Sequence, residues 1–241
     1  MKMIEKVFIS GSIIAKTGMH IGGSKSALDI GGIDLNVIKS AEGIPFIPGS
    51  SLKGKLRSIL AREAGSIAIR PEKKLPEGAI TDRDVPHIIE IFGDANDKSA
   101  QGTPSRLIVR DAFLDKAHFK QEKESNGIFS ELELEYTEGK WENTINRISG
   151  TAEHPRQLER VPAGAQFTFT FIYNVYDDGK KETHLNEIIK AMKILEDDYL
   201  GGQGSRGYGQ IEFGRPVKIE VKSIADYKGN NERRTENSVT F

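Results

Sequence analysis

The stretch QFTFTFIYNVYDDG, residues 166–179, alternates apolar side chains with more polar ones. Its apolar positions are Phe167, Phe169, Phe171, Tyr173 and Val175. A period of two is typical of a β-strand with one buried face. The residues Asp177-Asp178-Gly179 have the composition of a turn. This stretch therefore predicts a strand that ends in a change of direction.

A helix is expected directly after that turn. Apolar side chains recur there at helical spacing, at Leu185, Ile188, Ile189, Met192, Leu195 and Tyr199. Gly201 and Gly202 follow, in the position expected of a left-handed C-terminal cap. The last strand is predicted at Tyr208–Phe213, with a further one at Val217–Val221.

The first half of the chain has a similar order. Residues 4–14 predict a first strand, and Leu35–Ile38 fits a short one. A helix is expected from Ser51, with Ser50 or Ser51 as its N-cap. Strands are also expected at Leu107–Leu114 and where Leu132, Leu134 and Tyr136 alternate with glutamates. Strand, helix, strand, strand, helix, strand is the order of an α+β, ferredoxin-like fold, which serves many unrelated functions.

Long polar segments interrupt this order. We expect a single domain over residues 1–221, followed by a polar, loosely held tail at 222–241. Three insertions interrupt the domain, at about 15–48, 65–105 and 137–162. The second insertion contains a short helix at Val85–Phe92, which Gly93 ends. The third has few apolar anchors and is expected to be a protruding hairpin or a long loop.

The composition excludes several classes of protein. The chain has 241 residues and no cysteine, so disulfides, cysteine-ligated zinc and thiol catalysis are ruled out. No apolar stretch approaches 18 residues, which predicts a soluble protein of the cytoplasm without a membrane partner. The net charge of −1 argues against a strongly basic nucleic-acid-binding domain, although a balanced chain can still carry one basic face.

Gly49–Lys55 satisfies most of the spacing of a nucleotide-binding Walker loop. The next residue is Leu56, where that loop needs a hydroxyl for magnesium, and Pro48 precedes it in place of a strand. Nucleotide hydrolysis is therefore not favoured. The same residues still offer hydroxyls, free amides at a helix start and three cations, which suit a sugar-phosphate backbone.

The segment GGQGSRGYGQ at Gly201–Gln210 contains five glycines, with Arg206 and Tyr208 between them. It follows a helix and enters a strand, so it is not a dinucleotide fingerprint. A tight turn that needs positive φ angles would explain one or two of the glycines. A close approach of the backbone to a ligand would explain five. Both interpretations stay open at this point.

Neither the acidic residues nor the histidines predict a familiar catalytic set. Asp34 lies in a glycine-rich connection with only Asp29 nearby, so a two-metal site or a catalytic triad cannot be assembled from local sequence. The five histidines, His20, His87, His118, His154 and His184, show no ligand spacing for zinc. Trp141 lies beside Lys140, with Arg147, Arg156 and Arg160 following. These residues could clamp a base, or the tryptophan could anchor a loop.

Several separate segments together resemble the RAMP superfamily. They are IPFIPGSSLKGKLRSIL at 44–60, RLIVRDAF at 106–113, TEGKWENTINRISGTAEHPRQLERVPAGAQF at 137–167 and LGGQGSRGYGQIEF at 200–213. More narrowly, the chain is similar to the repeated backbone subunit, the third Csm subunit, of type III-A CRISPR effectors. The resemblance runs from Thr17 to Phe213 and is specific in combination.

The resemblance implies an RRM-type topology, a thumb-like hairpin and head-to-tail stacking of copies along a CRISPR RNA, together with other Csm subunits. It also implies an endoribonuclease that cuts target RNA paired to that guide, with a divalent metal ion such as Mg²⁺. The catalytic aspartate of the family matches Asp34, which is also the candidate metal ligand. The expected contacts to the guide backbone are Ser51, Lys53, Lys55, Arg57 and Arg206, with His20 lining the same groove.

Three alternatives remain open from the sequence. They are the backbone subunit of the type III-B (Cmr) complex, a subunit that binds guide RNA without cutting, and a guide-processing ribonuclease. The lack of a histidine-based acid–base set argues against the third. An ordinary Asp pKa of about 3.9 makes Asp34 a weak base near neutral pH, so holding a metal ion or orienting the flipped nucleotide is the role expected of it.

Overall fold

The structure is a computed structural model that describes residues 1–23, 33, 35–66, 85–93, 104–236 and 241. Two predictions lie outside these residues. They concern Asp34, the candidate catalytic residue, and most of the second insertion.

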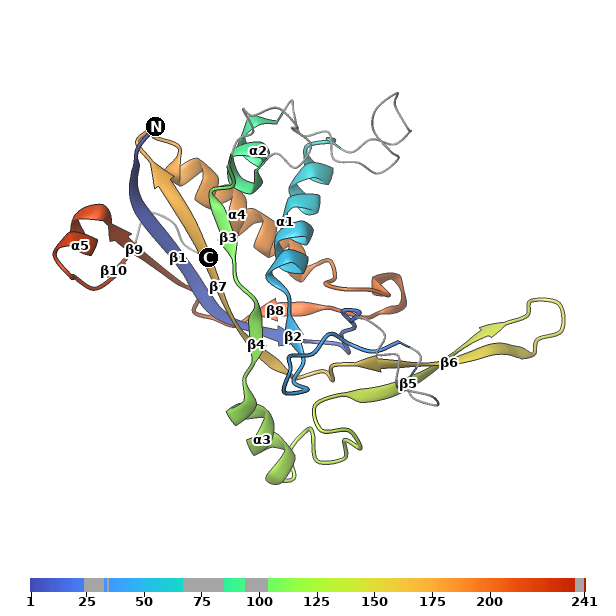
Figure 1. Cartoon of the computed structure of the whole chain (residues 1–241). Helices are drawn as coiled ribbons and strands as arrows, with labels where there is room; N and C mark the ends of the chain where they lie inside the picture. The colour runs from blue at the N-terminus through green and yellow to red at the C-terminus, as the bar shows by residue number, and fades with distance from the viewer. Residues whose placement is uncertain (24–32, 34, 67–84, 94–103, 237–240) are drawn as a thin grey trace.

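An antiparallel sheet forms the centre of the molecule (Figure 1). Its two longest strands are β1 (Met3–Ala15) and β7 (Gln166–Tyr176), which pair with Ile9 opposite Phe171. The main path runs β10-β9-β1-β7-β4-β2, while β8 adds to β1 and β3 adds to β7. The shorter strands are β2 (Phe46–Ile47), β3 (Leu107–Val109), β4 (Ala112–Leu114), β8 (Ile211–Phe213), β9 (Lys218–Ser223) and β10 (Arg234–Thr235). An α+β fold with an antiparallel sheet is confirmed.

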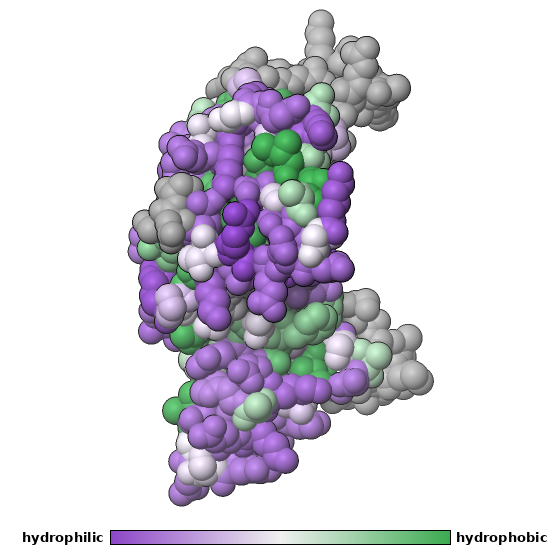
Figure 2. All heavy atoms as spheres, turned by 90° about the vertical axis from the view of Figure 1, so that its left-hand side faces the viewer, coloured by the Kyte–Doolittle hydropathy of each residue, from purple (hydrophilic) through white to green (hydrophobic). Residues whose placement is uncertain are grey.

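Three helices cover one face of the sheet (Figure 1): α1 (Gly49–Glu63), α2 (Pro86–Phe92) and α4 (Lys181–Glu196). The core lies between them and the sheet. The alternating apolar side chains of β7 all point into it, and Val7, Ile9 and Ile13 of β1 do the same. On the other face Thr168 is exposed, and Figure 2 shows mostly hydrophilic residues on one side of the molecule. The period of two in β7 is therefore explained by its core-facing side, whereas in β1 Phe8 on the opposite face is also buried, with the Arg233 guanidinium 3.6 Å from the centre of its ring.

Helix α1 begins differently from the sequence prediction. Neither Ser50 nor Ser51 caps it, because the helix already starts at Gly49, with Pro48 at the N-cap position. Asp111 supplies the acceptor instead: its Oδ1 receives the Gly49 N–H at 2.7 Å. A β-carbon at Gly49 would lie 2.3 Å from the Val109 carbonyl oxygen, so only glycine allows this approach.

The strand expected at Leu107–Leu114 is broken into β3 and β4 at Arg110 and Asp111. The break changes which side chains face the core. Leu107 is buried before the break, whereas after it Ala112 and Leu114 are buried and Phe113 is exposed. Asp111 is thereby placed in a turn, where its carboxylate can reach α1.

The strand predicted around Leu132–Tyr136 is wrong, since residues 130–137 form turns and bends. The alternating pattern has no neighbouring strand to pair with here. Instead, the sequence did not predict α3 (Lys116–Glu124), which Asp115 caps by accepting the His118 N–H. The Lys123 ammonium, on α3, donates to two carbonyl oxygens of the turn segment, those of Leu134 and Glu135.

A hairpin of β5 (Glu138–Ile145) and β6 (Ala152–Arg160) occupies the third insertion. The two strands form their own sheet and project from the body (Figure 1). Trp141 lies on this hairpin with 64% of its surface exposed, so it does not anchor a loop to the core. A projecting hairpin, one of the two structures expected here, is therefore present.

The C-terminal elements correct two further predictions. Helix α4 ends at Glu196 with Asp197 as its C-cap, so Gly201 and Gly202 do not cap it. The segment after Lys222 is not loosely held where it is described. It contains α5 (Ile224–Lys228), begun by a capping box between Ser223 and Asp226, and β10, which pairs with β9.

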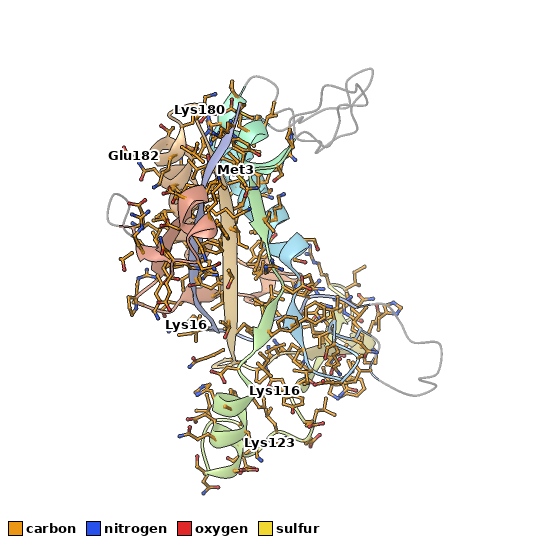
Figure 3. All side chains as sticks on the ribbon, turned by 60° about the vertical axis from the view of Figure 1, so that its left-hand side comes forward. Met3, Lys16, Lys116, Lys123, Lys180 and Glu182 are labelled. Carbon is orange, nitrogen blue, oxygen red and sulfur yellow. The ribbon has the colours of Figure 1, made fainter. Side chains whose placement is uncertain are left out.

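The two ends of the sheet differ in their surroundings. Figure 3 shows Met3 and Lys180 at one end and Lys16, near the last residues of β1, at the other. Helix α3, marked by Lys116 and Lys123, lies beyond the Lys16 end. The chain leaving β1 at this end continues to Gly18 and His20, which lead to the candidate site.

Candidate functional site

The glycine-rich loop lies between α4 and β8 and is fixed to the chain that leaves β1. The Gly202 N–H donates to the His20 carbonyl at 2.8 Å, and the Gly209 N–H donates to the Gly18 carbonyl at 3.0 Å. The Leu200 N–H closes the loop on the Gly209 carbonyl at 2.8 Å. Residues 18–20 and the loop therefore form one backbone-bonded unit.

The five glycines do not have the same role. A β-carbon would lie 2.3 Å from the His20 carbonyl oxygen at Gly201, 2.1 Å from the Leu200 carbonyl oxygen at Gly209, and 2.1 Å from the Tyr199 ring at Gly204. Gly207 has open space around it but a φ of 82°, which favours glycine. These four glycines are explained by the fold of the loop.

Gly202 has neither a positive φ nor a crowded neighbourhood. A β-carbon there would lie 3.8 Å from its nearest neighbours, both atoms of His20, which is ordinary contact. The turn interpretation thus accounts for four glycines. Gly202 is the one whose lack of a side chain the internal packing does not explain, and it is the position where close approach of a ligand remains a reason for glycine.

Lys55 joins α1 to the start of the glycine-rich loop. Its Nζ lies 2.9 Å from Asp198 Oδ2 and 3.8 Å above the centre of the Tyr199 ring. Ser51 is one helical turn away, and side chains at i and i+4 share a helix face. This face of α1 is the one that the structure brings to the loop.

Lys53 and Arg57 share another face of α1. The Nζ of Lys53 donates to Ser105 Oγ at 2.6 Å, just before β3. Burial, reinforced by the nearby charge of Arg57, lowers the pKa of Lys53. The structure therefore does not bring Lys53 to the glycine-rich loop, although both were expected to contact the guide.

His20 is buried, with its Nδ1 2.7 Å from the Glu159 carbonyl oxygen. The same ring lies beside Gly202, and a β-carbon at Gly22 would be 3.6 Å from its Nε2. His20 therefore lies against the loop, as a residue lining a groove there would. The Nδ1 of His20 is therefore hydrogen-bonded to the backbone of β6.

Arg206 joins the loop to the hairpin. Its Nη1 lies 2.9 Å from Glu142 Oε2, and the Tyr208 hydroxyl donates to the other oxygen of this carboxylate at 2.9 Å. Burial would raise the pKa of Glu142, but the hydrogen bonds from Tyr208, Arg156 and Arg206 outweigh it and lower that pKa. The carboxylate therefore stays ionised between these partners.

Sequence reasoning gave Tyr208 no role at the site. The ring is buried, and the Lys140 ammonium lies 4.7 Å and the Arg160 guanidinium 5.1 Å from its centre. Burial, followed by the hydrogen bond to Glu142, raises the pKa of Tyr208. An aromatic residue inside a glycine-rich run was the only signal in the sequence.

Glu159 was also missed. Its side chain is 2% exposed, and it accepts the Val37 N–H at 3.0 Å, the Thr137 hydroxyl at 2.6 Å and the Lys39 ammonium at 2.5 Å. Its own N–H donates to the Leu35 carbonyl at 2.9 Å. Residues 35–39 are thus fixed to the base of the hairpin by these contacts and by one isolated bridge, Leu35 to Leu158, and they do not form the predicted short strand. Asp34 directly precedes them in the sequence and lies outside the described residues.

The described residues also bear on nucleotide, metal and membrane binding. Leu56, at the position where a Walker loop needs a hydroxyl, is fully buried in the core. Among the described residues, no group of three or more His, Asp or Glu side chains could hold a metal ion. Across that same part of the chain, no helix is both long and apolar enough to cross a membrane.

Comparison with known proteins places this geometry in a family. The model of the RAMP superfamily matches residues 12–212. The chain is 42% identical over 235 residues to the CRISPR system Cms endoribonuclease Csm3 of Methanocaldococcus jannaschii, covering 96% of this chain and 87% of that protein. It is 41% identical over 233 residues to the protein of that name from Streptococcus thermophilus, covering 95% and 97%.

Solved structures agree. A crystal structure of a Csm3–Csm4 subcomplex of the type III-A CRISPR-Cas interference complex matches with a TM-score of 0.60 and 30% identity, covering all of this chain and 92% of that one. The crystal structure of Methanopyrus kandleri Csm3 matches in fold, with a TM-score of 0.57 and 22% identity. By sequence and by fold, this chain belongs to the RAMP superfamily and, within it, to the Csm3 family of type III-A CRISPR proteins.

Proposed function

We propose that this chain is a backbone subunit of a type III-A CRISPR effector that binds guide RNA and cleaves the target RNA paired to it. The observation that carries the proposal is the identity of 41–42%, over nearly the whole chain, to relatives named endoribonucleases. The meeting of α1, His20 and the glycine-rich loop supports it, because these are the segments expected to hold a nucleic-acid backbone.

The guide is bound through its backbone in this proposal, and base pairing supplies sequence recognition. Lys55 and Arg206 border the loop and His20 lies beside Gly202, while Ser51 shares the helix face of Lys55. Lys53 and Arg57 would contact a more distant part of the backbone along α1. Such contacts release counterions, so binding should weaken as salt rises.

The finer fold assignment belongs to this proposal. The strand order with β9 and β8 beside β1, β1 beside β7, and β7 beside β3 and β4 supports a ferredoxin-like, RRM-type core. The projecting hairpin would be its thumb. The partners would be CRISPR RNA, target RNA, further copies stacked head to tail, and other Csm subunits, such as the Csm4 present in the matching crystal structure, in the cytoplasm.

Cleavage is assigned to Asp34. RNA can be cut by its own 2′-hydroxyl, so no protein nucleophile is required, and a carboxylate could orient the flipped nucleotide for in-line attack. Glu159 fixes residues 35–39, the segment that directly follows Asp34 in the sequence, and this supports the proposal. The described residues alone supply no ligand set for Mg²⁺. A metal requirement is therefore proposed from the family resemblance, and no step is routed through the ion.

Replacing Asp34 in the assembled effector tests the proposal. The Asp34→Ala and Asp34→Asn complexes, loaded with guide, should bind a labelled complementary RNA as the wild type does and fail to cut it. Cleavage by either variant at the wild-type rate would refute the role of Asp34. A wild-type complex that binds target without cutting it, with or without added Mg²⁺, would make the chain a structural subunit.

A further inference from the structure

The side chains of Arg156 and Arg206 come from different parts of the chain and meet at one atom. Arg156 lies on β6, directly opposite Glu142 on β5, while Arg206 lies in the glycine-rich loop. Glu142 Oε2 is 3.0 Å from Arg156 Nη2 and 2.9 Å from Arg206 Nη1. The two guanidinium nitrogens can therefore be no more than about 6 Å apart.

Two cations this close would repel each other without the carboxylate between them. The Tyr208 hydroxyl holds the second oxygen of Glu142 at 2.9 Å, and only 12% of the Glu142 side chain is exposed. The position of Glu142 is thus fixed from the buried side. Its carboxylate aligns one arginine of the hairpin with one arginine of the loop.

Both arginines keep donors for a further partner. A guanidinium carries five N–H groups, and the contact with Glu142 uses one terminal nitrogen of each arginine. The side chains of Arg156 and Arg206 are 41% and 55% exposed. The two guanidinium groups lie close enough for the two non-bridging oxygens of a single phosphate to accept hydrogen bonds from both.

The charge around this pair is positive although that of the whole chain is −1. Four cations gather around Tyr208 and its partner Glu142, namely Lys140, Arg156, Arg160 and Arg206. Two carboxylates, Glu142 and Glu138, are paired with three of these cations. Four positive and two negative charges leave +2 at the junction of the hairpin and the loop, which favours an anion.

We propose that Arg156 and Arg206, aligned by Glu142, form a clamp for one phosphodiester group of the bound RNA at the junction of the hairpin and the glycine-rich loop. The clamp rests on the proposed function and adds Arg156 as a phosphate contact and Glu142 as its positioning residue.

The test measures binding of a labelled single-stranded oligo(U) RNA to the full chain by fluorescence anisotropy over a series of salt concentrations. Arg156→Ala should weaken binding on the order of fivefold, and Arg156→Lys should recover part of it because the charge remains while the fork is lost. Arg233→Ala is the matched control. Its side chain is 44% exposed and paired with Glu220, and it should bind as the wild type does.

The double variant Arg156→Ala/Arg206→Ala distinguishes one phosphate from two. One shared phosphate predicts that the slope of log K against log salt falls in magnitude by about 0.7, the value for one contact in a single strand. A fall of about twice that value would overturn the clamp. In a Glu142→Gln background, the effects of Arg156→Ala and Arg206→Ala on RNA affinity should become additive. Unchanged coupling between the two effects would show that Glu142 does not position the clamp.

Two other outcomes separate the clamp from the proposed function. If Arg206→Ala weakens RNA binding while Arg156→Ala leaves both RNA binding and thermal stability unchanged, the clamp is wrong and the proposed function stands. If Arg156→Ala instead weakens self-association measured by sedimentation, the arginine serves a protein contact and the clamp is wrong. A wild-type chain that binds no RNA overturns both.

Discussion

The ring of Tyr199 lies so close to Gly204 that a β-carbon at this glycine would come within 2.1 Å of it. The same ring carries the ammonium of Lys55 at 3.8 Å. Gly204→Ala should therefore displace an aromatic side chain that links α1 to the loop. We expect a loss of about 1–3 kcal/mol in the free energy of unfolding, measured by denaturant titration.

Gly202→Ala is the control for that substitution. Its β-carbon would meet only ordinary contacts, so stability should stay within about 0.5 kcal/mol of the wild type. RNA affinity should nevertheless fall if the backbone of RNA approaches Gly202 closely. A stable Gly202→Ala chain with unchanged affinity would show that Gly202 is not needed for ligand approach.

Gly54→Ala should make the protein more stable. Gly54 lies inside α1, is exposed, and has no neighbouring atom within 4 Å of the position that an alanine β-carbon would take. Glycine in an exposed helix interior costs about 0.5–1 kcal/mol relative to alanine. We expect a rise in Tm of about 2–4 °C per kcal/mol gained. A fall in Tm would mean that this face of α1 is packed against something.

Asp111→Ala should destabilise α1, because Asp111 supplies the acceptor for the Gly49 N–H that Pro48 cannot provide. The expected cost is about 1 kcal/mol, the usual effect of losing an N-cap acceptor. Asp111→Asn keeps an acceptor oxygen and should recover most of it. Equal losses for the two variants would show that charge, rather than the hydrogen bond, stabilises the helix start.

Glu159→Ala should destabilise the base of the hairpin. The substitution leaves the Val37 N–H and the Thr137 hydroxyl without their acceptor and the Lys39 ammonium without its counter-ion. Unsatisfied buried donors cost about 1–3 kcal/mol. Glu159→Gln keeps one acceptor oxygen and should lose less. Hydrogen exchange of the amides of residues 35–39 gives a local measurement, and no increase in Glu159→Ala would contradict the assignment.

Asp226 should make the stability of the protein depend on pH in the acidic range. Hydrogen bonds from the Ser223 hydroxyl and N–H lower the pKa of this carboxyl to about 2. The unfolded value is about 3.9, so the stabilisation is complete above about pH 4 and is lost as the pH falls towards 2. The Tm difference between wild type and Asp226→Asn should be present near neutral pH and shrink over this window. A difference that does not change with pH would refute the assignment.

The sequence predicted those parts of the fold whose signals are local. The alternation in β7 and the helical spacing in α4 depend on neighbouring residues that share one buried face, so both elements were found. The same reasoning failed at residues 132–136, because alternation alone does not supply a partner strand. It also placed a serine cap on α1, whose actual acceptor, Asp111, lies 62 positions further along the chain.

The candidate site shows the same limit. Sequence reasoning named Arg206 and Lys55, but the partners that orient them, Glu142 and Asp198, are distant in the chain. Nothing in the local pattern distinguishes Glu142 from the other glutamates of the hairpin. Contacts between segments decide which charged side chains are held in place, and those contacts appear only in the folded structure.

The hairpin of β5 and β6 joins the body at the end formed by Glu138 and Arg160, and its other end projects as an arm. Strand β5 has eight residues, so at about 3.3 Å per residue the arm is about 26 Å long. A tilt of about 10° at its base would carry the tip through about 4–5 Å. Glu159 holds the base of this arm, and the Arg156–Glu142–Arg206 contacts hold it about halfway along β5, so a small change in either set of contacts would be amplified at the tip.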